Sequence, residues 1–408
     1  MIQAIKAKYI LTPNQSYIED SAVIVKDSKI IDIVSSSDLN KSKYKIIDLQ
    51  KSVLLPGFIN AHVHLELYWT QSLLKPFNSF TEWLSQIIDL KKKFNNKKIP
   101  ISVKKSIKES IDSGVTTIGQ ISSYNGLDYE PIINSGIRTV YFYELTNSTI
   151  GNLDKKFLQK ILNKKINTLF HPRIFPHSIY SLDSKSLKKV MNFAKEKDID
   201  LGIHLSESIE EIKYAKGQKN NLEKNILSKL MKQTKLSNNK STPLEYLDKL
   251  NTNKQEIALI HMNNLTKRDL EILKTRNYPV VLCPRSNAYL NQNLPNIKFF
   301  SKYEKTGIGT DGLSSNLSIN FLDEINFLYL YAKKIVSKNS EKKIIDMATI
   351  GGAKALGLDR IVGSIEINKN ADLIAFELIN KDPFLSIIHS KKNNLKMSMI
   401  NGKILRLK

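Results

Sequence analysis

About eight short apolar runs alternate with helical patterns through the middle of the chain. The runs are PGFINAHVH, VTTIGQI, RTVYFYEL, PRIFPHSIYS, DLGIHLSES, EIALIHMN, PVVLCPRSN and TGIGTDG. Strands that alternate with helices form parallel sheets, and a set of this number closes into a (β/α)8 barrel. The sequence therefore predicts an α/β fold with a TIM barrel, which we place at residues 57–361.

Both ends of the chain have the pattern of β-sheet. IKAKYIL and SAVIVKDSKIIDIV lie near the N-terminus, and LKMSMINGKILRL near the C-terminus carries an Asn401-Gly402 hairpin turn. Two strand-rich ends can pair into one small domain, so we expect a β-sandwich made of residues 1–56 and 362–408. The Lys/Asn-rich stretch from Gly217 to Ser241 indicates an insertion after the fifth barrel strand, helical in part.

The formal net charge of +23 raises the question of a polyanionic partner such as nucleic acid. The lysines are spread over the predicted helices and do not form one arm interleaved with aromatics, so we expect no nucleic-acid partner. We also expect a cytoplasmic protein without a membrane partner, because no apolar run approaches the ~18 to 20 residues of a membrane helix and no signal-peptide pattern is present. Cys283 is the only cysteine, which excludes a zinc site built on several thiolates.

Uncommon polar residues gather at the C-terminal ends of the apolar runs. They are His62, His64, His177, His204, His261 and Asp311. In a parallel barrel these strand ends meet at one rim, where active sites lie. His62 and His64 are two residues apart, so a strand would present both imidazoles on one face. A lone H-x-H is also typical of a polar strand face, and the other strand ends are what favour a metal site.

Three imidazoles and one carboxylate suit a divalent ion such as zinc or iron, with one position open for water. Glu207, three residues after His204, is the candidate general base; alternatively it is a first-turn acid of the next helix, where negative charge is favoured. His261 either orients the attacking water or is a core histidine. His177 is a candidate for contact with substrate.

The motifs PGFINAHVHLE, HLSE, IHMN, CPRSN, GIGTDGLSSN and GSIEINKNADLIAFE follow one another over nearly the whole chain. Together they resemble the amidohydrolase superfamily, in its branch of adenosine-type, guanine and triazine hydrolases. The resemblance implies one catalytic zinc or iron ion held by His62, His64, His204 and Asp311. It implies catalytic roles for Glu207, His261 and Asp311 in a hydrolytic deamination. A non-catalytic scaffold is the alternative, and the retention of all these residues weighs against it.

Within this branch the chain looks most like the aminofutalosine deaminases of menaquinone-making bacteria, which act on a small adenine nucleoside. Deaminases of methylthioadenosine, S-adenosylhomocysteine or adenosine stay open alternatives, as do triazine- and guanine-type hydrolases, and the resemblance leaves room for a homodimer. It implies that His177 and Asn287 face the substrate, and that Arg285 meets a carboxylate on its tail or is a structural ion-pair residue. Related enzymes place a ribose-binding acid beyond a motif like SFTEWL, where this chain reads DLKKKF. Glu82 or Asp89 takes that role, or sugar recognition differs.

Overall fold

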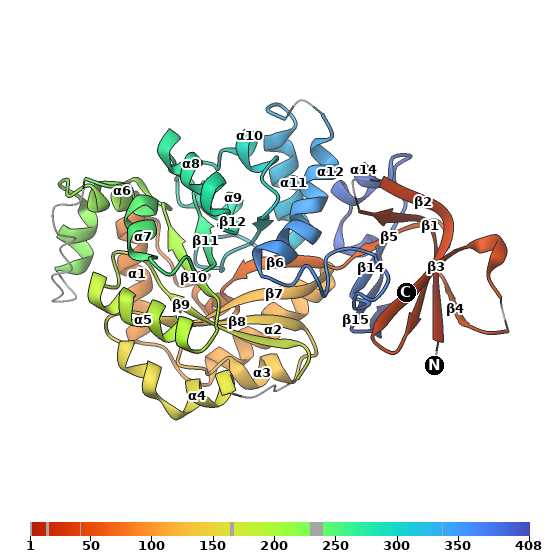
Figure 1. Ribbon diagram of the computed structural model, residues 1–408, viewed down its shortest axis with the longest axis horizontal. Helices are drawn as coiled ribbons and strands as arrows, with labels where there is room; N and C mark the ends of the chain where they lie inside the picture. Colours follow the sequence, from red (N-terminus) through yellow and green to blue (C-terminus); the bar gives the residue numbers. More distant parts are fainter. Residues whose placement is uncertain (1, 14–15, 41, 164–166, 229–239, 337) are drawn as a thin grey trace.

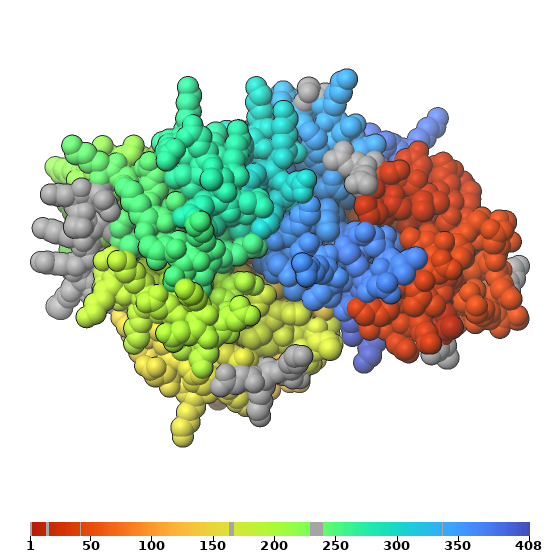
Figure 2. All heavy atoms as spheres, in the orientation of Figure 1, coloured from red at the N-terminus to blue at the C-terminus, as the bar shows by residue number. Residues whose placement is uncertain are grey.

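A computed structural model describes residues 2–13, 16–40, 42–163, 167–228, 240–336 and 338–408. It contains a closed barrel of parallel strands and a separate mixed sheet (Figure 1). The sheet lies at the end of the molecule that holds both termini, and Figure 2 shows the red N-terminal strands packed there against the blue C-terminal part of the chain. The predicted α/β fold with a TIM barrel is confirmed.

Each of the predicted apolar runs forms one barrel strand. The strands are β6 (Phe58–Val63), β7 (Val115–Ser122), β8 (Arg138–Leu145), β9 (Phe170–Pro176), β10 (Leu201–Leu205), β11 (Ile257–His261), β12 (Val280–Leu282) and β13 (Thr306–Ile308). Neighbours pair in chain order, and β13 closes the barrel onto β6 through Ile308 and Asn60. Parallel strands of this kind are covered on both faces, which explains why the runs are almost continuously apolar.

Helices connect the strands and cover the barrel. They are α1 (Phe80–Lys92), α2 (Lys98–Asp112), α3 (Tyr129–Ile133), α4 (Lys156–Asn163), α5 (Ser184–Glu196), α6 (Ile209–Ala215), α7 (Pro243–Leu250), α8 (Lys267–Arg276), α9 (Pro284–Tyr289), α10 (Ile297–Phe300), α11 (Phe321–Ala332), α12 (Ser340–Asp346), α13 (Gly352–Ala355) and α14 (Pro383–Ile388). At α7, Thr242 and Glu245 cap each other's backbone N–H groups, which fixes where the helix begins. The predicted insertion contains a short π-helical turn at Leu222–Leu227, and residues 229–239 lie outside the described residues. None of the helices in the described ranges is long and apolar enough to cross a bilayer.

The strands from both chain ends form one mixed sheet. They are β1 (Ile2–Thr12), β2 (Ser16–Lys26), β3 (Lys29–Ser35), β4 (Lys45–Asp48), β5 (Ser52–Pro56), β14 (Leu373–Glu377), β15 (Leu395–Ile400) and β16 (Lys403–Leu407). The order is β16-β15-β14-β5-β1-β2-β3, with β4 paired to β1 beside this path. The sheet has an apolar core of its own, which includes Ile5, Val23, Leu54, Leu373 and Met397. The hairpin turn is confirmed, because Asn401 and Gly402 join β15 to β16 with φ of 52° and 77°. The exact domain boundaries stay a prediction.

A buried ion pair fastens this sheet to the barrel. Arg138, the first residue of β8, donates from Nε and Nη2 to the two carboxylate oxygens of Asp372 at 2.8 and 2.9 Å. Its Nη1 donates to the carbonyl of Thr168, and Asp372 also accepts from the backbone N–H of Asn401. Each guanidinium nitrogen and each carboxylate oxygen therefore has a partner, although both side chains are buried. The pair lies at the N-terminal end of β8, on the side of the barrel opposite the strand ends that carry the histidines.

Replacement of Arg138 by Met should lower the free energy of unfolding by about 3–5 kcal/mol, because it leaves the Asp372 carboxylate buried without its partner. The matched control is Arg268→Met, which removes an exposed pair with Glu271 and should cost less than about 1 kcal/mol. Chemical denaturation of both variants measures the difference. Equal losses in the two variants would contradict a fastening role for the buried pair.

Candidate active site

The uncommon polar residues of the strand ends meet at one rim of the barrel. His62 lies on β6 and His64 follows it, His204 lies on β10, His261 ends β11, and Asp311 follows β13. Ligand atoms of His62, His64 and His204 lie within 4.8 Å of one another, and so do those of His62, His261 and Asp311. All five side chains are buried. The structure therefore brings the predicted ligands into one cluster.

Several nitrogen atoms in this cluster lack a protein partner. Both ring nitrogens of His62 and Nδ1 of His64 are buried without a hydrogen bond to any described residue. Asp311 Oδ1 lies 3.4 Å from Nε2 of His62 and 3.7 Å from Nε2 of His64. Because buried polar atoms normally have partners, unsatisfied imidazoles beside a carboxylate fit a divalent cation of the borderline type.

Backbone and amide oxygens set the tautomers of two rings. A carbonyl oxygen only accepts, so His204 must donate from Nδ1 to the carbonyl of His177 at 3.0 Å. His261 donates from Nδ1 to Oδ1 of Asn287 at 3.3 Å, and the Asn287 amide donates in turn to Oδ1 of Asn263. Each ring therefore keeps Nε2 as an acceptor, which is the form that a metal or a water molecule can use.

The carboxylate of Asp311 is held on both oxygens. Its Oδ2 accepts from the hydroxyls of Ser286 and Ser315, both at 2.7 Å, and its Oδ1 accepts from the backbone N–H of Gly312 at 2.9 Å. Burial alone would raise the pKa of Asp311, but the neighbouring imidazoles, His62 first and then His64 and His261, hold the pKa well below its usual value. Asp311 is thus an ionised carboxylate in a fixed orientation.

The backbone at the rim is unusual in ways that place these side chains. His261, Asp311 and Ser206 have φ of 78°, 58° and 53°, in the left-handed region that non-glycine residues rarely adopt. Gly309 lets the chain before Asp311 approach β6 closely, since a Cβ there would lie 2.7 Å from the carbonyl oxygen of His62. Gly309 of the GIGTD run thus allows the close backbone contact that brings Asp311 beside β6.

Glu207 precedes the helix that follows its strand. Ser208 caps α6 by accepting from the N–H of Glu211, so Glu207 is outside the first turn. Its Oε1 lies 3.6 Å from Nε2 of His261. Burial, and then the charges of Asp311 and Glu211, raise the pKa of Glu207 well above its usual value. The structure therefore places Glu207 outside the first turn of α6 and beside His261, and its catalytic role stays a prediction.

A cavity of about 560 Å³ opens above the cluster. Its apolar wall consists of Leu67, Trp83, Leu84, Ile87, Ile88, Ile226 and Leu227. His177, Glu207 and His261 also line it, and His177 binds the hydroxyls of Ser178 and Ser181 through Nδ1. Burial lowers the pKa of His177 to about 4. A concave apolar site with a few converging polar groups is typical of small-molecule binding.

Three other residues that were predicted to contact the substrate are not among the described residues that line this cavity. Glu82 is exposed at the start of α1, where it accepts from the backbone N–H of Asn78. The Arg285 guanidinium faces the buried carboxylate of Glu324 at 3.7 Å, as a structural ion-pair residue would. Asn287 lies behind His261 and orients it. Substrate contacts by these three residues stay predictions.

Two acids near the cluster were not singled out from the sequence. Glu66 is fully buried, accepts from the Gln120 amide at 2.6 Å, and lies 3.8 Å from Nδ1 of His64. Burial would raise the pKa of Glu66, but His64 and Gln120 hold it below its usual value. Glu144, near the end of β8, lines the cavity. Both acids are at strand ends, so the rule that found the histidines could have found them.

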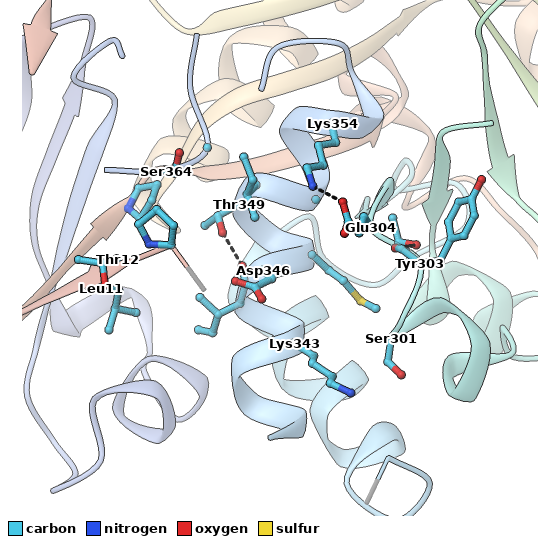
Figure 3. A pocket seen from close by; sticks show the side chains of 18 of the residues that line it. Leu11, Thr12, Ser301, Tyr303, Glu304, Lys343, Asp346, Thr349, Lys354 and Ser364 are labelled. Carbon is cyan, nitrogen blue, oxygen red and sulfur yellow. Dashed lines mark hydrogen bonds and ion pairs between the residues drawn. The ribbon is translucent and has the colours of Figure 1, made fainter. Parts of the chain in front are cut away.

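A second cavity, of about 360 Å³, lies between the terminal sheet and the barrel. Figure 3 shows Leu11 and Thr12 of β1 on one side of it and Tyr303 and Glu304 on the other, with Lys354 paired to Glu304. No predicted site residue is among those described as lining it. The cavity at the rim is therefore the candidate active site.

Replacement of Gly309 by Ala should lower the free energy of unfolding by about 1–3 kcal/mol, because the new methyl group overlaps the His62 backbone. The control is Gly151→Ala, where an added Cβ meets nothing within 4 Å; its stability should be unchanged or slightly higher. Thermal or chemical unfolding measures both. A Gly309→Ala protein as stable as the parent would show that this close approach is not required.

Comparison with known proteins finds deaminases that are similar to this chain over most of their length. It is 29% identical to the aminodeoxyfutalosine deaminase of a Nitratiruptor species, over 92% of each chain. It is 28% identical to the 5-methylthioadenosine/S-adenosylhomocysteine deaminase of Thermodesulfovibrio yellowstonii, over 98% of this chain and 92% of that one.

Solved structures show the same fold. The crystal structure of Helicobacter pylori aminofutalosine deaminase in complex with methylthio-coformycin has a TM-score of 0.86 and 24% identity, and the match covers 99% of this chain and 100% of that one. The sequence pattern of the Amidohydrolase family matches residues 53–405, which span the barrel and most of the C-terminal strands. The chain belongs to the amidohydrolase family and is a hydrolase that acts on carbon–nitrogen bonds.

Proposed function

We propose that this chain removes the 6-amino group of an adenine nucleoside by hydrolysis. The observation that carries this proposal is the placement of the Glu207 carboxyl group 3.6 Å from Nε2 of His261, beside the histidine–aspartate cluster and inside the rim cavity. Both relatives described above are named as deaminases, and the name of one of them includes adenosine, which supports the same reaction class.

One zinc or iron ion is part of this proposal. The residues that would hold it are His62, His64, His204 and Asp311, whose buried and partly unsatisfied ligand atoms fit such an ion. When bound, a divalent cation supplies Lewis acidity and lowers the pKa of a water molecule from ~15.7 towards ~7. The donor set does not distinguish zinc from iron.

Glu207 has the properties of a proton shuttle. Burial raises its pKa well above the usual value, so this carboxyl group holds a proton more readily than an exposed glutamate does. It can take up the first proton that the attacking water loses and give it to the ring nitrogen next to the amino-bearing carbon. It can then take the second proton from the newly added hydroxyl and deliver it to the leaving amine, which departs as ammonia while the carbonyl forms.

His261 complements this role. Burial lowers its pKa to about 3, so the ring is neutral. With Nδ1 committed to Asn287, its Nε2 can accept a hydrogen bond from the attacking water and orient it. The ionised Asp311 is a second acceptor for the same water. The net reaction converts an adenine ring and water to a hypoxanthine ring and ammonia.

Aminodeoxyfutalosine is the substrate that we propose first, because the Nitratiruptor relative bears that name at 29% identity. A methylthioadenosine or S-adenosylhomocysteine deaminase is the second candidate. The apolar wall formed by Trp83, Leu84 and Leu227 favours it, since a thioether tail would bury well there, and the relative of that name is almost as similar.

A substrate panel tests the reaction. Aminodeoxyfutalosine, methylthioadenosine, S-adenosylhomocysteine and adenosine should show the ultraviolet shift from adenine to hypoxanthine, with the highest kcat/KM for aminodeoxyfutalosine. Atrazine and guanine are the controls from other branches of the resemblance. Hydrolysis of either control without any reaction of the adenine nucleosides would contradict the proposed function.

Two substitutions separate metal binding from proton transfer. Glu207→Gln should lower kcat by about 10²–10⁴-fold, because the shuttle is lost, and leave the metal content of the protein unchanged. His204→Ala should lose both metal and activity, whereas the exposed His389→Ala should lose neither. Elemental analysis and steady-state kinetics measure the two effects. A Glu207→Gln enzyme with near-normal kcat would refute the shuttle.

A further inference from the structure

One wall of the rim cavity carries a buried carboxylate that the proposed chemistry does not use. Glu144 lines the cavity, and only 7% of its side chain is exposed. Its Oε1 lies 3.6 Å from Nζ of Lys91, which comes from α1. Its Oε2 is buried and has no hydrogen-bond partner among the described residues. This carboxylate therefore has an acceptor that the protein itself does not satisfy.

A buried carboxylate oxygen without a partner costs free energy unless a ligand donates a hydrogen bond to it. An unpaired buried oxygen of a charged group loses the hydrogen bonds that water would give it. Burial alone would raise the pKa of Glu144, but the charges of Lys91 and His177 hold it below its usual value. The group is thus an ionised carboxylate, which can only accept hydrogen bonds. A ligand that binds this carboxylate must therefore carry hydrogen-bond donors.

The surroundings of Glu144 are suited to a hydroxylated ligand. Other polar residues that line the cavity are Ser123, Asn125, Thr146, Ser148 and Thr149, from the loops after β7 and β8. The apolar residues of the same cavity come mainly from α1 and from the turn at Leu222–Leu227. A nucleoside has both kinds of surface, a flat ring and a polyol, and the sugar hydroxyls are donors that an ionised carboxylate can accept.

We propose that Glu144 binds the sugar of the substrate by accepting hydrogen bonds from the 2′- and 3′-hydroxyls of the ribose. This inference rests on the proposed function. Lys91 is a positioning residue that keeps the carboxylate charged and in place. The enzyme therefore selects ribonucleosides over nucleosides that lack this diol. Glu82 and Asp89 are both exposed and are not among the described residues of the cavity wall, so neither competes for this role.

The test compares kcat/KM for adenosine and for 2′,3′-dideoxyadenosine in metal-loaded enzyme. The parent protein should prefer adenosine by about 10- to 100-fold, the factor expected for hydrogen bonds to a charged group. Glu144→Ala should reduce this preference to about 1- to 3-fold, by lowering kcat/KM for adenosine while turnover of the dideoxy compound remains. Glu144→Gln, which keeps one acceptor without the charge, should be intermediate.

Glu130→Gln is the matched control, because Glu130 is an exposed acid outside this cavity, and it should retain the parental preference. Inhibition by inosine and 2′,3′-dideoxyinosine should follow the same order without any chemical step. A Glu144→Ala enzyme that keeps the parental preference would overturn the inference, as would a parent that does not favour adenosine. An enzyme that hydrolyses no adenine nucleoside would instead contradict the proposed function.

Discussion

Closure of the parallel barrel is the constraint on which the rest of the structure depends. Since β13 pairs with β6, the C-terminal ends of strands distant in the sequence must meet at one rim. His62 and Asp311 are separated by most of the barrel in sequence, yet they are neighbours because closure makes their strands adjacent. The left-handed backbone at His261 and Asp311 is local strain that only a rigid scaffold of this kind can hold.

The rim contains several buried ionisable groups, and burying any one of them alone would cost free energy. Glu207 and Asp311 are both acids of the same cavity. Asp311 faces imidazoles and accepts three hydrogen bonds, whereas Glu207 is buried beside the charges of Asp311 and Glu211. Their pKa values are therefore moved in opposite directions, so that one acid carries a proton and the other carries a charge at the same pH. A pair of acids divided in this way is what acid–base chemistry near neutral pH requires.

The sequence predicted the barrel, both terminal strand regions and the residues of the central cluster, because period, β-branched composition and strand-end position are local signals. It did not reveal that Arg285 is paired with Glu324, since this depends on side-chain directions across separate elements. Glu82 was favoured by its place near a motif, but in the fold it begins a helix and points to the backbone of Asn78. Contacts between distant elements are what the linear pattern leaves undetermined.

The mixed sheet has a consequence for how the chain is made. Strand β5 leads directly into the first barrel strand, but one of its edges is paired by β14, which is synthesised only after the whole barrel. During translation that edge of β5 therefore stays unpaired. The apolar side chains of β1 and β2 that pack against β14 in the folded protein also stay uncovered. An unpaired apolar edge is a template for association with other chains. The strands that follow the barrel therefore close an edge of β5 that a chain ending before β14 would leave open to association with other chains.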